Sequence, residues 1–167
     1  TPELLALMRR AGCELIHFGV ESGVPSVAAA TGKKQSLDSV RKAIQAAHNV
    51  GMRTLCYFLI GMPGESALQM QQTLDFAMGL GPTYASFQVA TPYPKTPWHA
   101  EHFEESTEAF PSVFDSELNE VELRQYSRRL TARYHLRPGY VFSRLRTPGR
   151  RAALRETKLL AKYLFTR

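Results

Sequence analysis

The sequence predicts an α/β fold in which three parallel strands, joined by crossover helices, make half of a (β/α) barrel, followed by a wholly helical C-terminal part. Two segments of the same design, residues 16–23 and 57–66, indicate this fold. Each is an apolar run that ends in a glycine and a carboxylate. Such runs are typical of parallel strands with helices on both faces, and α/β proteins place ligands at the carboxyl ends of these strands.

Length and composition predict an ordinary globular protein. The chain has 167 residues, of which 44% are hydrophobic, enough to form a core. No apolar stretch reaches the roughly 20 residues of a membrane span, and no signal pattern opens the sequence, so we expect a cytoplasmic protein without a membrane span. Cys13 and Cys56 form no CxxC pair and predict no metal site, and both are expected to be buried.

Charge divides the chain into an acidic and a basic part. Residues 1–123 hold eight Lys and Arg against 14 Asp and Glu, a net charge of 8 − 14 = −6, whereas residues 124–167 hold 13 against one, a net charge of +12. A basic helical tail can bind nucleic acid or an acidic membrane surface. It can also form the solvated face of helices packed on an acidic partner domain, and the lack of an aromatic stacking platform favours this second interpretation.

The first elements follow from apolar runs and glycines. An apolar stripe from Leu4 to Met8 predicts a helix, and Gly12 stands where its C-cap would fall. A strand through Val20 comes next, and residues 25–30 predict a short helix after the turn. Ser36 is then a suitable N-cap for a longer helix.

The next two strands complete the barrel part. The second strand spans Arg53 to Ile60, and Ser66 with Gln69 predicts a capping box for the helix that follows. That helix exits near Gly81, and a strand from Tyr84 to Ala90 leads into a proline-rich loop. Each crossover is long enough to join parallel neighbours in the right-handed sense.

Beyond the loop the pattern is helical, with helices expected at 116–134, 138–145 and 151–165. We therefore expect three parts: the C-terminal half of a barrel (1–97), an acidic linker (98–116) and a basic helical C-terminal extension (117–167). Three strands alone leave sheet edges that should be covered. We expect a missing N-terminal half or a second copy of the chain to cover them.

Glu21 is the first candidate binding residue. A carboxylate just past a strand accepts two strong hydrogen bonds and suits a vicinal diol or an ammonium group. Ser22 adds a hydroxyl, and Gly19 and Gly23 leave room for a ribose. Alternatively, Glu21 caps the next helix and the glycines only permit tight packing; the local sequence favours neither. His17, inside the same strand, is expected to be a core histidine.

The turn after the second strand is the second candidate site. Ile60, Gly61, Pro63 and Gly64 bend the chain so that its backbone groups can hydrogen-bond the edge of an adenine. Glu65 starts the next helix, where the helix dipole favours a structural role over a catalytic one. Elsewhere, two adjacent lysines at 33 and 34 either pair with an anionic ligand group or remain solvated.

Together these motifs resemble a known family. FGVESG at 18–23, FLIGMPGES at 58–66 and TPYPKTP at 91–97 resemble strands four to six of a radical S-adenosylmethionine (SAM) domain. The likeness is narrower to the cobalamin-binding subgroup, which includes the anaerobic magnesium-protoporphyrin monomethyl ester cyclase and several methyltransferases. The tail, with Tyr134 and residues 137–141, resembles the C-terminal extension of that subgroup, so the resemblance covers nearly the whole chain.

The resemblance implies SAM as the ligand. Glu21 would contact the SAM ribose or amino group, with Ser22 and Gly23 beside it. Lys33 or its neighbour would face the methionine carboxylate, and the turn from Ile60 to Gly64 would meet the adenine.

The loop at 91–97 would close the substrate side, through Tyr93, Lys95 and Thr96. The family's loop usually reads Pro-Tyr-Pro-Gly-Thr, and here Lys95 replaces the glycine. A lysine at this place can meet an anionic substrate.

One departure from the family concerns the mechanism. Family members bind a 4Fe-4S cluster through a CxxxCxxC loop and cleave SAM to a radical, and this sequence has no such loop. Because thiolates hold these clusters, we expect no catalytic and no metal-ligating residue in this chain. The parent enzyme would bind the cluster and cobalamin and perform radical methylation or oxidative cyclisation on a large porphyrin or lipid-like substrate.

Two other functions stay open. The chain can be a non-catalytic binding or scaffold protein that kept the barrel part. It can also bind nucleic acid through the basic tail, in which case affinity falls steeply with salt.

Overall fold

The computed structural model describes residues 1–102 and 116–146. Its elements are α1 (Pro2–Arg10), β1 (Leu15–Glu21), α2 (Pro25–Ala30), α3 (Leu37–Asn49), β2 (Arg53–Ile60), α4 (Ala67–Leu80), β3 (Tyr84–Val89), α5 (Pro97–His102), α6 (Glu120–His135) and α7 (Pro138–Arg146). The expected order of strands and crossover helices is confirmed. The short helix α5 was not expected, and the helix expected at 151–165 lies outside the described residues.

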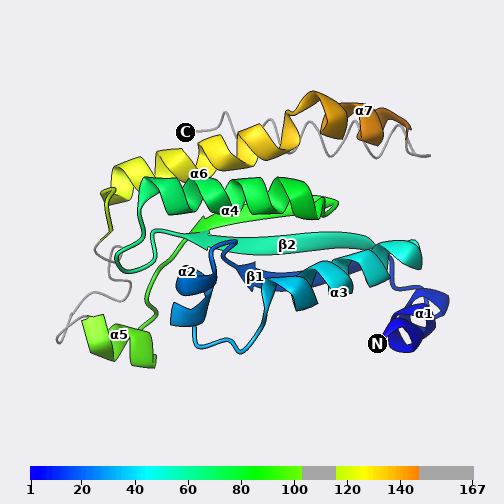
Figure 1. Cartoon of the computed structure of the whole chain (residues 1–167), viewed down its shortest axis with the longest axis horizontal. Helices are drawn as coiled ribbons and strands as arrows, with labels where there is room; N and C mark the ends of the chain where they lie inside the picture. Colours follow the sequence, from blue (N-terminus) through cyan, green and yellow to red (C-terminus); the bar gives the residue numbers. More distant parts are fainter. Residues whose placement is uncertain (103–115, 147–167) are drawn as a thin grey trace.

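The three strands form one parallel sheet in the order β1-β2-β3 (Figure 1). Leu15 lies opposite Arg53, and Leu55 lies opposite Tyr84. Helices α2 and α3 connect the first pair of strands and α4 connects the second pair. This is the α/β class that the sequence predicts, with a helical part after it.

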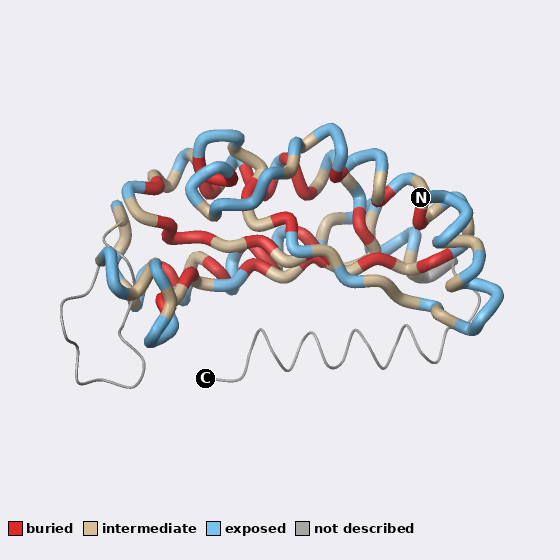
Figure 2. Tube along the Cα trace, turned by 90° about the horizontal axis from the view of Figure 1, so that it is seen from below, coloured by how far each residue is buried: buried red, intermediate tan, exposed pale blue. Residues whose placement is uncertain are grey.

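The core lies on one face of this sheet. Along β2, Thr54, Cys56, Phe58 and Ile60 are buried, while the residues between them are half-buried. The buried side chains pack against α3, α4 and α6, and Figure 2 shows the buried positions gathered along the sheet and the inner sides of the helices.

The expectation that helices cover both faces is therefore wrong for the described residues. The other face carries Leu55, Tyr57 and Leu59, which are half-buried, and His17, which is exposed. In a (β/α) barrel this second face looks into the interior, where side chains of other strands fill it. A barrel part thus has one helical layer, not two.

Helix ends follow the capping residues. Ser66 and Gln69 make both hydrogen bonds of a capping box, and Gly81 ends α4 in the left-handed conformation, as expected. Helix α6 begins four residues later than expected, because Asn119 and Glu122 form its capping box. Ser116 is not the cap, since its hydroxyl donates to the Leu118 carbonyl at 2.9 Å.

Helix α6 shares the core of the sheet and also covers its β3 edge. Leu123, Leu130 and Tyr134 are fully buried in the same cluster as β2 and β3. The Ser127 hydroxyl donates to the Phe87 carbonyl at 2.6 Å, and His135 Nε2 accepts from the Ala85 amide at 3.5 Å. These side chains take backbone groups that a further strand would otherwise use.

The β1 edge is less covered. The Gln35 amide donates to the Gly19 carbonyl at 3.3 Å and to the Val20 carbonyl at 3.0 Å, which covers only the carboxyl end of the strand. In the described ranges, β1 has no strand on its outer side.

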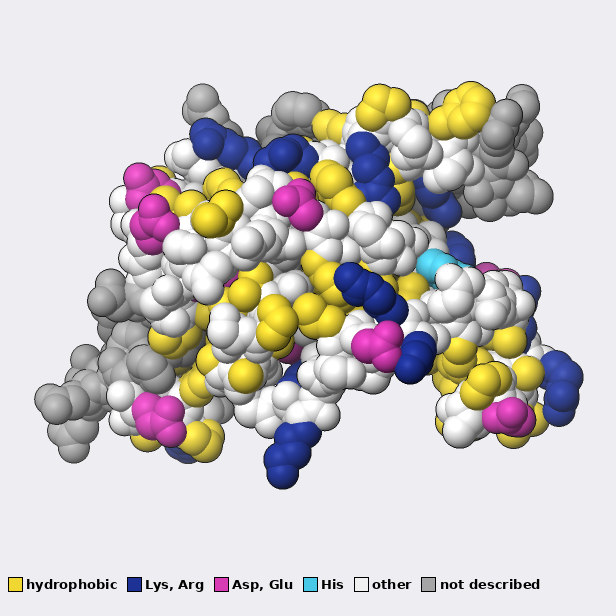
Figure 3. Space-filling model, in the orientation of Figure 1, with side chains coloured by type: hydrophobic (Ala, Val, Ile, Leu, Met, Phe, Trp, Pro, Cys, Tyr) yellow, Lys and Arg dark blue, Asp and Glu magenta, His cyan; other side chains and the backbone are white. Residues whose placement is uncertain are grey.

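Basic side chains gather on the helical layer. Figure 3 shows Lys and Arg side chains over α6, along the upper edge of the face in view. Among the residues with a described structure, no helix combines the length and apolarity needed to cross a bilayer.

Candidate functional site

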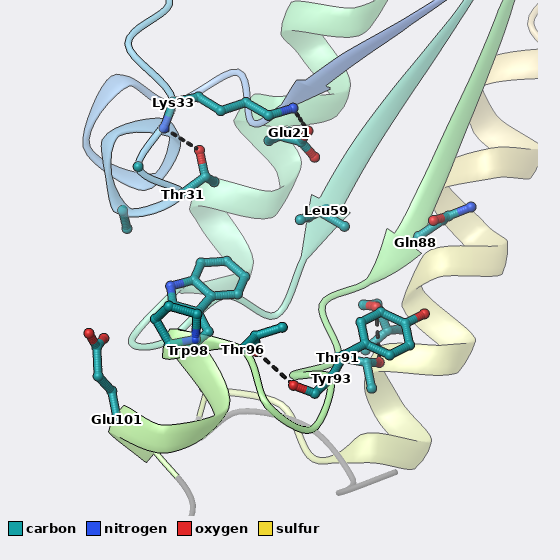
Figure 4. A pocket seen from close by; sticks show the side chains of 14 residues that line it. Glu21, Thr31, Lys33, Leu59, Gln88, Thr91, Tyr93, Thr96, Trp98 and Glu101 are labelled. Carbon is teal, nitrogen blue, oxygen red and sulfur yellow. Dashed lines mark hydrogen bonds and ion pairs between the residues drawn. The ribbon is translucent and has the colours of Figure 1, made fainter. Parts of the chain in front are cut away.

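A cavity of about 670 Å³ opens at the carboxyl ends of the strands. Glu21 from β1, Leu59 from β2 and Gln88 from β3 line it, together with residues after α2, the loop after β3 and α5. Figure 4 shows Glu21 and Lys33 at one end of this cavity and the rings of Trp98 and Tyr93 at the other. The two sequence segments that end in Gly and Glu do not contribute equally: the first places its carboxylate, Glu21, in the lining, whereas the second contributes only Leu59 and not its glycine turn or Glu65.

An irregularity in β1 places the Glu21 side chain in the cavity. The pairing with β2 shifts between Gly19 and Glu21, and Glu21 has φ of 69°. A positive φ is uncommon for a residue with a side chain, and bulges of this kind re-aim side chains beside binding sites.

Glu21 and Lys33 form an ion pair at the cavity wall. Lys33 Nζ bonds Glu21 Oε1 and also donates to the Gly19 carbonyl at 3.3 Å. The Glu21 side chain is 13% exposed and that of Lys33 is 45% exposed. A Cβ on Gly19 would lie 2.6 Å from Lys33 Nζ and 2.7 Å from Glu21 Oε1, so this glycine leaves room for the pair itself.

Ser22 and Gly23 point into the helical layer and not into the cavity. Ser22 is fully buried, and its hydroxyl is 3.1 Å from the Thr73 hydroxyl on α4. The Gly23 amide donates to the same hydroxyl at 3.1 Å. A Cβ on Gly23 would lie 2.4 Å from the Cβ of Phe76, so this residue serves close packing.

The turn that contains Ile60, Gly61, Pro63 and Gly64 also lies outside the cavity lining. Its backbone is already engaged within the chain: the Ile60 carbonyl accepts from the Ala90 amide at 2.8 Å. Gly61 is buried, and a Cβ on it would lie 2.7 Å from Leu123 of α6. The predicted contact of this turn with adenine stays a prediction.

Glu65 closes this turn from inside. Its side chain is 1% exposed, and its Oε2 accepts from the Met62 amide at 3.1 Å, while Oε1 has no hydrogen-bond partner among the described residues. Burial raises the pKa of this carboxyl, and the amides of Met62 and Gly61 oppose that shift. The contacts of this carboxylate are with the turn, and Ser66, not Glu65, caps α4.

The loop after β3 supplies two of the three residues expected on the substrate side. Tyr93 and Thr96 line the cavity, and the Thr96 hydroxyl donates to the Tyr93 carbonyl at 2.7 Å. Lys95 is exposed, is not in the lining, and has φ of 68°. That backbone conformation favours glycine, the residue usual here in the family that the sequence resembles.

Sequence reasoning missed several residues at this site. Trp98 of α5, Thr31 and Gln88 line the cavity without belonging to any motif, and Leu59 lines it although only the turn after it in its motif was expected at the site. The one available signal was Trp98, the single tryptophan of the chain, directly after the proline-rich loop.

His17 was wrongly expected in the core. It is exposed on the open face of the sheet, where its Nδ1 lies 3.3 Å from the Tyr57 hydroxyl and the two rings meet edge to face. The prediction failed because a strand position that faces a barrel interior lies within the same kind of apolar run as a position that faces the helices.

The cysteines do not fit an iron-sulfur cluster. Cys56 is fully buried, and burial raises the pKa of its thiol to about 12. Cys13 is half-buried and its thiol donates to the Leu15 carbonyl at 3.5 Å. Over 1–102 and 116–146, no group of three His, Cys, Asp or Glu side chains could hold a metal ion.

Part of the chain is similar to a known protein family. Residues 1–77 match the model of the radical SAM superfamily. An uncharacterized methyltransferase of Pyrococcus horikoshii is 38% identical over 93 residues, which are 53% of this chain and 19% of that protein. The anaerobic magnesium-protoporphyrin IX monomethyl ester cyclase of Rubrivivax gelatinosus is 27% identical over 92 residues, or 55% of this chain and 17% of the cyclase. The matched part thus spans about a fifth of each relative.

A solved structure supports the fold. The radical SAM methyltransferase TsrM of Kitasatospora setae, with cobalamin and a 4Fe-4S cluster bound, superposes with a TM-score of 0.56 at 23% identity. The match covers 61% of this chain and 19% of TsrM. Residues 1–77 are thus similar to the radical SAM superfamily, and the chain is similar to part of a methyltransferase and of a cyclase.

Proposed function

We propose that this chain forms one side of the SAM pocket in a radical SAM enzyme that methylates or oxidatively cyclises a large substrate such as a porphyrin or a lipid. The observation that carries the proposal is the Glu21–Lys33 pair at the wall of the 670 Å³ cavity. A carboxylate and an ammonium side by side complement the zwitterionic amino acid end of SAM.

The two charges have separate tasks in this proposal. The Glu21 carboxylate accepts hydrogen bonds from the SAM ammonium group or ribose hydroxyls, and Lys33 pairs with the methionine carboxylate. The strained backbone at Glu21 fixes the carboxylate before the ligand arrives, which lowers the ordering cost of binding. The remaining space, towards Tyr93, Thr96 and Trp98, would take the substrate.

In this proposal, none of the 167 residues binds the iron-sulfur cluster or cobalamin. The two cysteines are unsuitable, as described above. Residues elsewhere in the parent enzyme would hold both groups, which supply the radical and the methyl carrier. This chain alone would bind SAM without cleaving it.

Calorimetry with SAM on the 167-residue chain tests the proposal. We expect Glu21→Gln and Lys33→Met each to weaken SAM binding at least tenfold. Lys34→Met is the matched control, because Lys34 is exposed and does not line the cavity. Equal affinity for all four proteins, or loss of binding only in the control, would overturn the assignment.

The nucleic-acid alternative rests on the basic tail, and residues 147–167 of that tail lie outside the described structure. It predicts an electrophoretic shift with single-stranded DNA that disappears at high salt. A shift that persists at high salt, or none at all, would contradict it.

A further inference from the structure

A second cavity, of about 280 Å³, lies at the amino ends of the strands, far from Glu21. Its wall combines His48 from the last turn of α3, the loop at 81–83 before β3, and Arg137 with the start of α7. Arg144 and Ser143 of α7 complete it. None of these residues lines the first cavity, and those from the tail lie in or next to the segment at 137–141.

Arg137 is a cation held in place by aromatic rings, and among the described residues no carboxylate pairs with it. Its guanidinium carbon lies 4.0 Å from the centre of the Tyr134 ring and 5.7 Å from that of Tyr140. Its Nη1 is buried and has no hydrogen-bond partner within the described part of the chain. A buried charge without a counter-charge costs free energy, and no carboxylate from residues 1–102 or 116–146 lines this cavity.

Arg144 brings a second fixed guanidinium to the same cavity. Its Nη2 donates to the Tyr84 hydroxyl at 3.0 Å, and its guanidinium carbon lies 5.3 Å from the centre of that ring. Arginine matches the geometry of phosphate oxygens and binds them through two parallel hydrogen bonds. The first turn of α7 lies at the same wall, and the positive end of the helix dipole adds to the attraction for an anion.

The electrostatic surroundings support an anion rather than a cation. Burial lowers the pKa of the nearby His135, and Coulomb repulsion by Arg137 and Arg144 lowers it further. Burial also lowers the pKa of His48, whose Nε2 lies 2.9 Å from the Thr54 hydroxyl. The wall also holds two neutral hydroxyls, which are engaged within the chain: Tyr140 donates to the Thr83 carbonyl at 2.9 Å and Ser143 to the Tyr140 carbonyl at 2.7 Å.

We propose that this cavity binds a tetrahedral oxyanion, a phosphate group that is either free or carried by a small metabolite. Arg137 and Arg144 would hold the phosphate oxygens. The volume lies just below the usual range for small-molecule pockets, which suits a phosphate with a short substituent.

Calorimetric titration of the 167-residue chain with inorganic phosphate and with glycerol 3-phosphate tests this. We expect binding by the unaltered chain, and at least tenfold weaker binding by Arg137→Gln and by Arg144→Gln. Arg133→Gln is the matched control, since Arg133 is an exposed arginine of α6 that pairs with Gln71 and does not line the cavity. Tighter binding of glycerol 3-phosphate would identify the metabolite source, and tighter binding of phosphate the free ion.

An NMR titration of the unaltered chain locates the site independently of any variant. Phosphate should shift the amide signals of Thr83 and Gly139 while those of Glu21 and Lys33 stay in place. No binding by the unaltered chain would overturn the proposal. An effect of Arg133→Gln as large as that of Arg137→Gln would do the same, because it would show diffuse attraction to the basic helices.

Discussion

Among the described glycines, Gly23 is the one at which an added Cβ would meet another side chain at the shortest distance. A Cβ there would lie 2.4 Å from the Cβ of Phe76 and 3.0 Å from the Cα of Thr73. Both distances are shorter than van der Waals contact, so the backbone of α4 or of Gly23 would have to shift. We expect Gly23→Ala to lower the free energy of unfolding by about 1–3 kcal/mol, measured by urea denaturation. Gly79→Ala in the same helix is the control: nothing lies within 4 Å of its Cβ position, and we expect a gain of about 0.5–1 kcal/mol.

Glu65 makes stability depend on pH in a direction opposite to that of an ion-paired carboxylate. Burial raises its pKa in the folded state, so the folded chain binds this proton more tightly than the unfolded chain does. The free energy of unfolding should therefore fall as pH rises from about 4.3, the unfolded value, through the raised folded value. Glu65→Gln should flatten this fall in urea denaturation between pH 4.5 and 7. Equal slopes for both proteins would contradict the assignment.

The residues of the site were only partly predictable, because side chains along an extended chain point alternately to opposite faces of the sheet. Glu21 follows from the glycine-acid pattern, and it does line the cavity. Ser22, next to it, faces the other way and bonds Thr73 on α4. Successive side chains of a strand point to opposite faces, so neighbours in a motif do not share a site. Trp98 enters the cavity through a helix that no pattern predicts.

Among the elements, α6 extends the core of the sheet beyond the barrel part of the chain. Leu130 is fully buried against the sheet, whereas Val121 on the same helix is 65% exposed. We expect Leu130→Ala to cost about 2–5 kcal/mol of unfolding free energy and Val121→Ala less than about 0.5 kcal/mol, both measured by urea denaturation. A single transition shared by helix and sheet signals is also expected. A Leu130→Ala change that leaves the transition unmoved would show that α6 folds apart from the sheet.

Elements with local signals were predictable and those without were not. Strand β2 agrees with its expected bounds, because an apolar run stands between Gly51 and Gly61. Helix α4 agrees because Ser66 and Gln69 form the capping box that their spacing indicates. Helix α5 has six residues, too few for the helical periodicity of apolar residues to be recognised in the sequence. The open face of the sheet escaped prediction since barrel interiors and helical interfaces both select apolar residues.

For the whole molecule, the unequal sheet edges determine how copies can associate. Outside its carboxyl end, β1 offers unpaired backbone groups, and such edges pair with other chains. We expect the amides of β1, Ile16 to Phe18, to exchange hydrogen more slowly as protein concentration rises, with a dimer in light scattering. The amides of Ala85 and Phe87 on β3 are the internal control and should not respond. A monomer at all concentrations, with unchanged exchange at β1, would contradict this.

The two hydrogen bonds from Ser127 and His135 to β3 have a consequence for aggregation. A sheet open at both ends can add copies without limit and grow into a fibre. Among the described strands, α6 terminates the β3 end, which leaves the β1 end for growth by strand addition. Two copies that meet through β1 use up both open edges, and such an assembly closes on itself. If copies pair through β1 as expected, we expect removal of the two α6 side chains to let the pair add further copies.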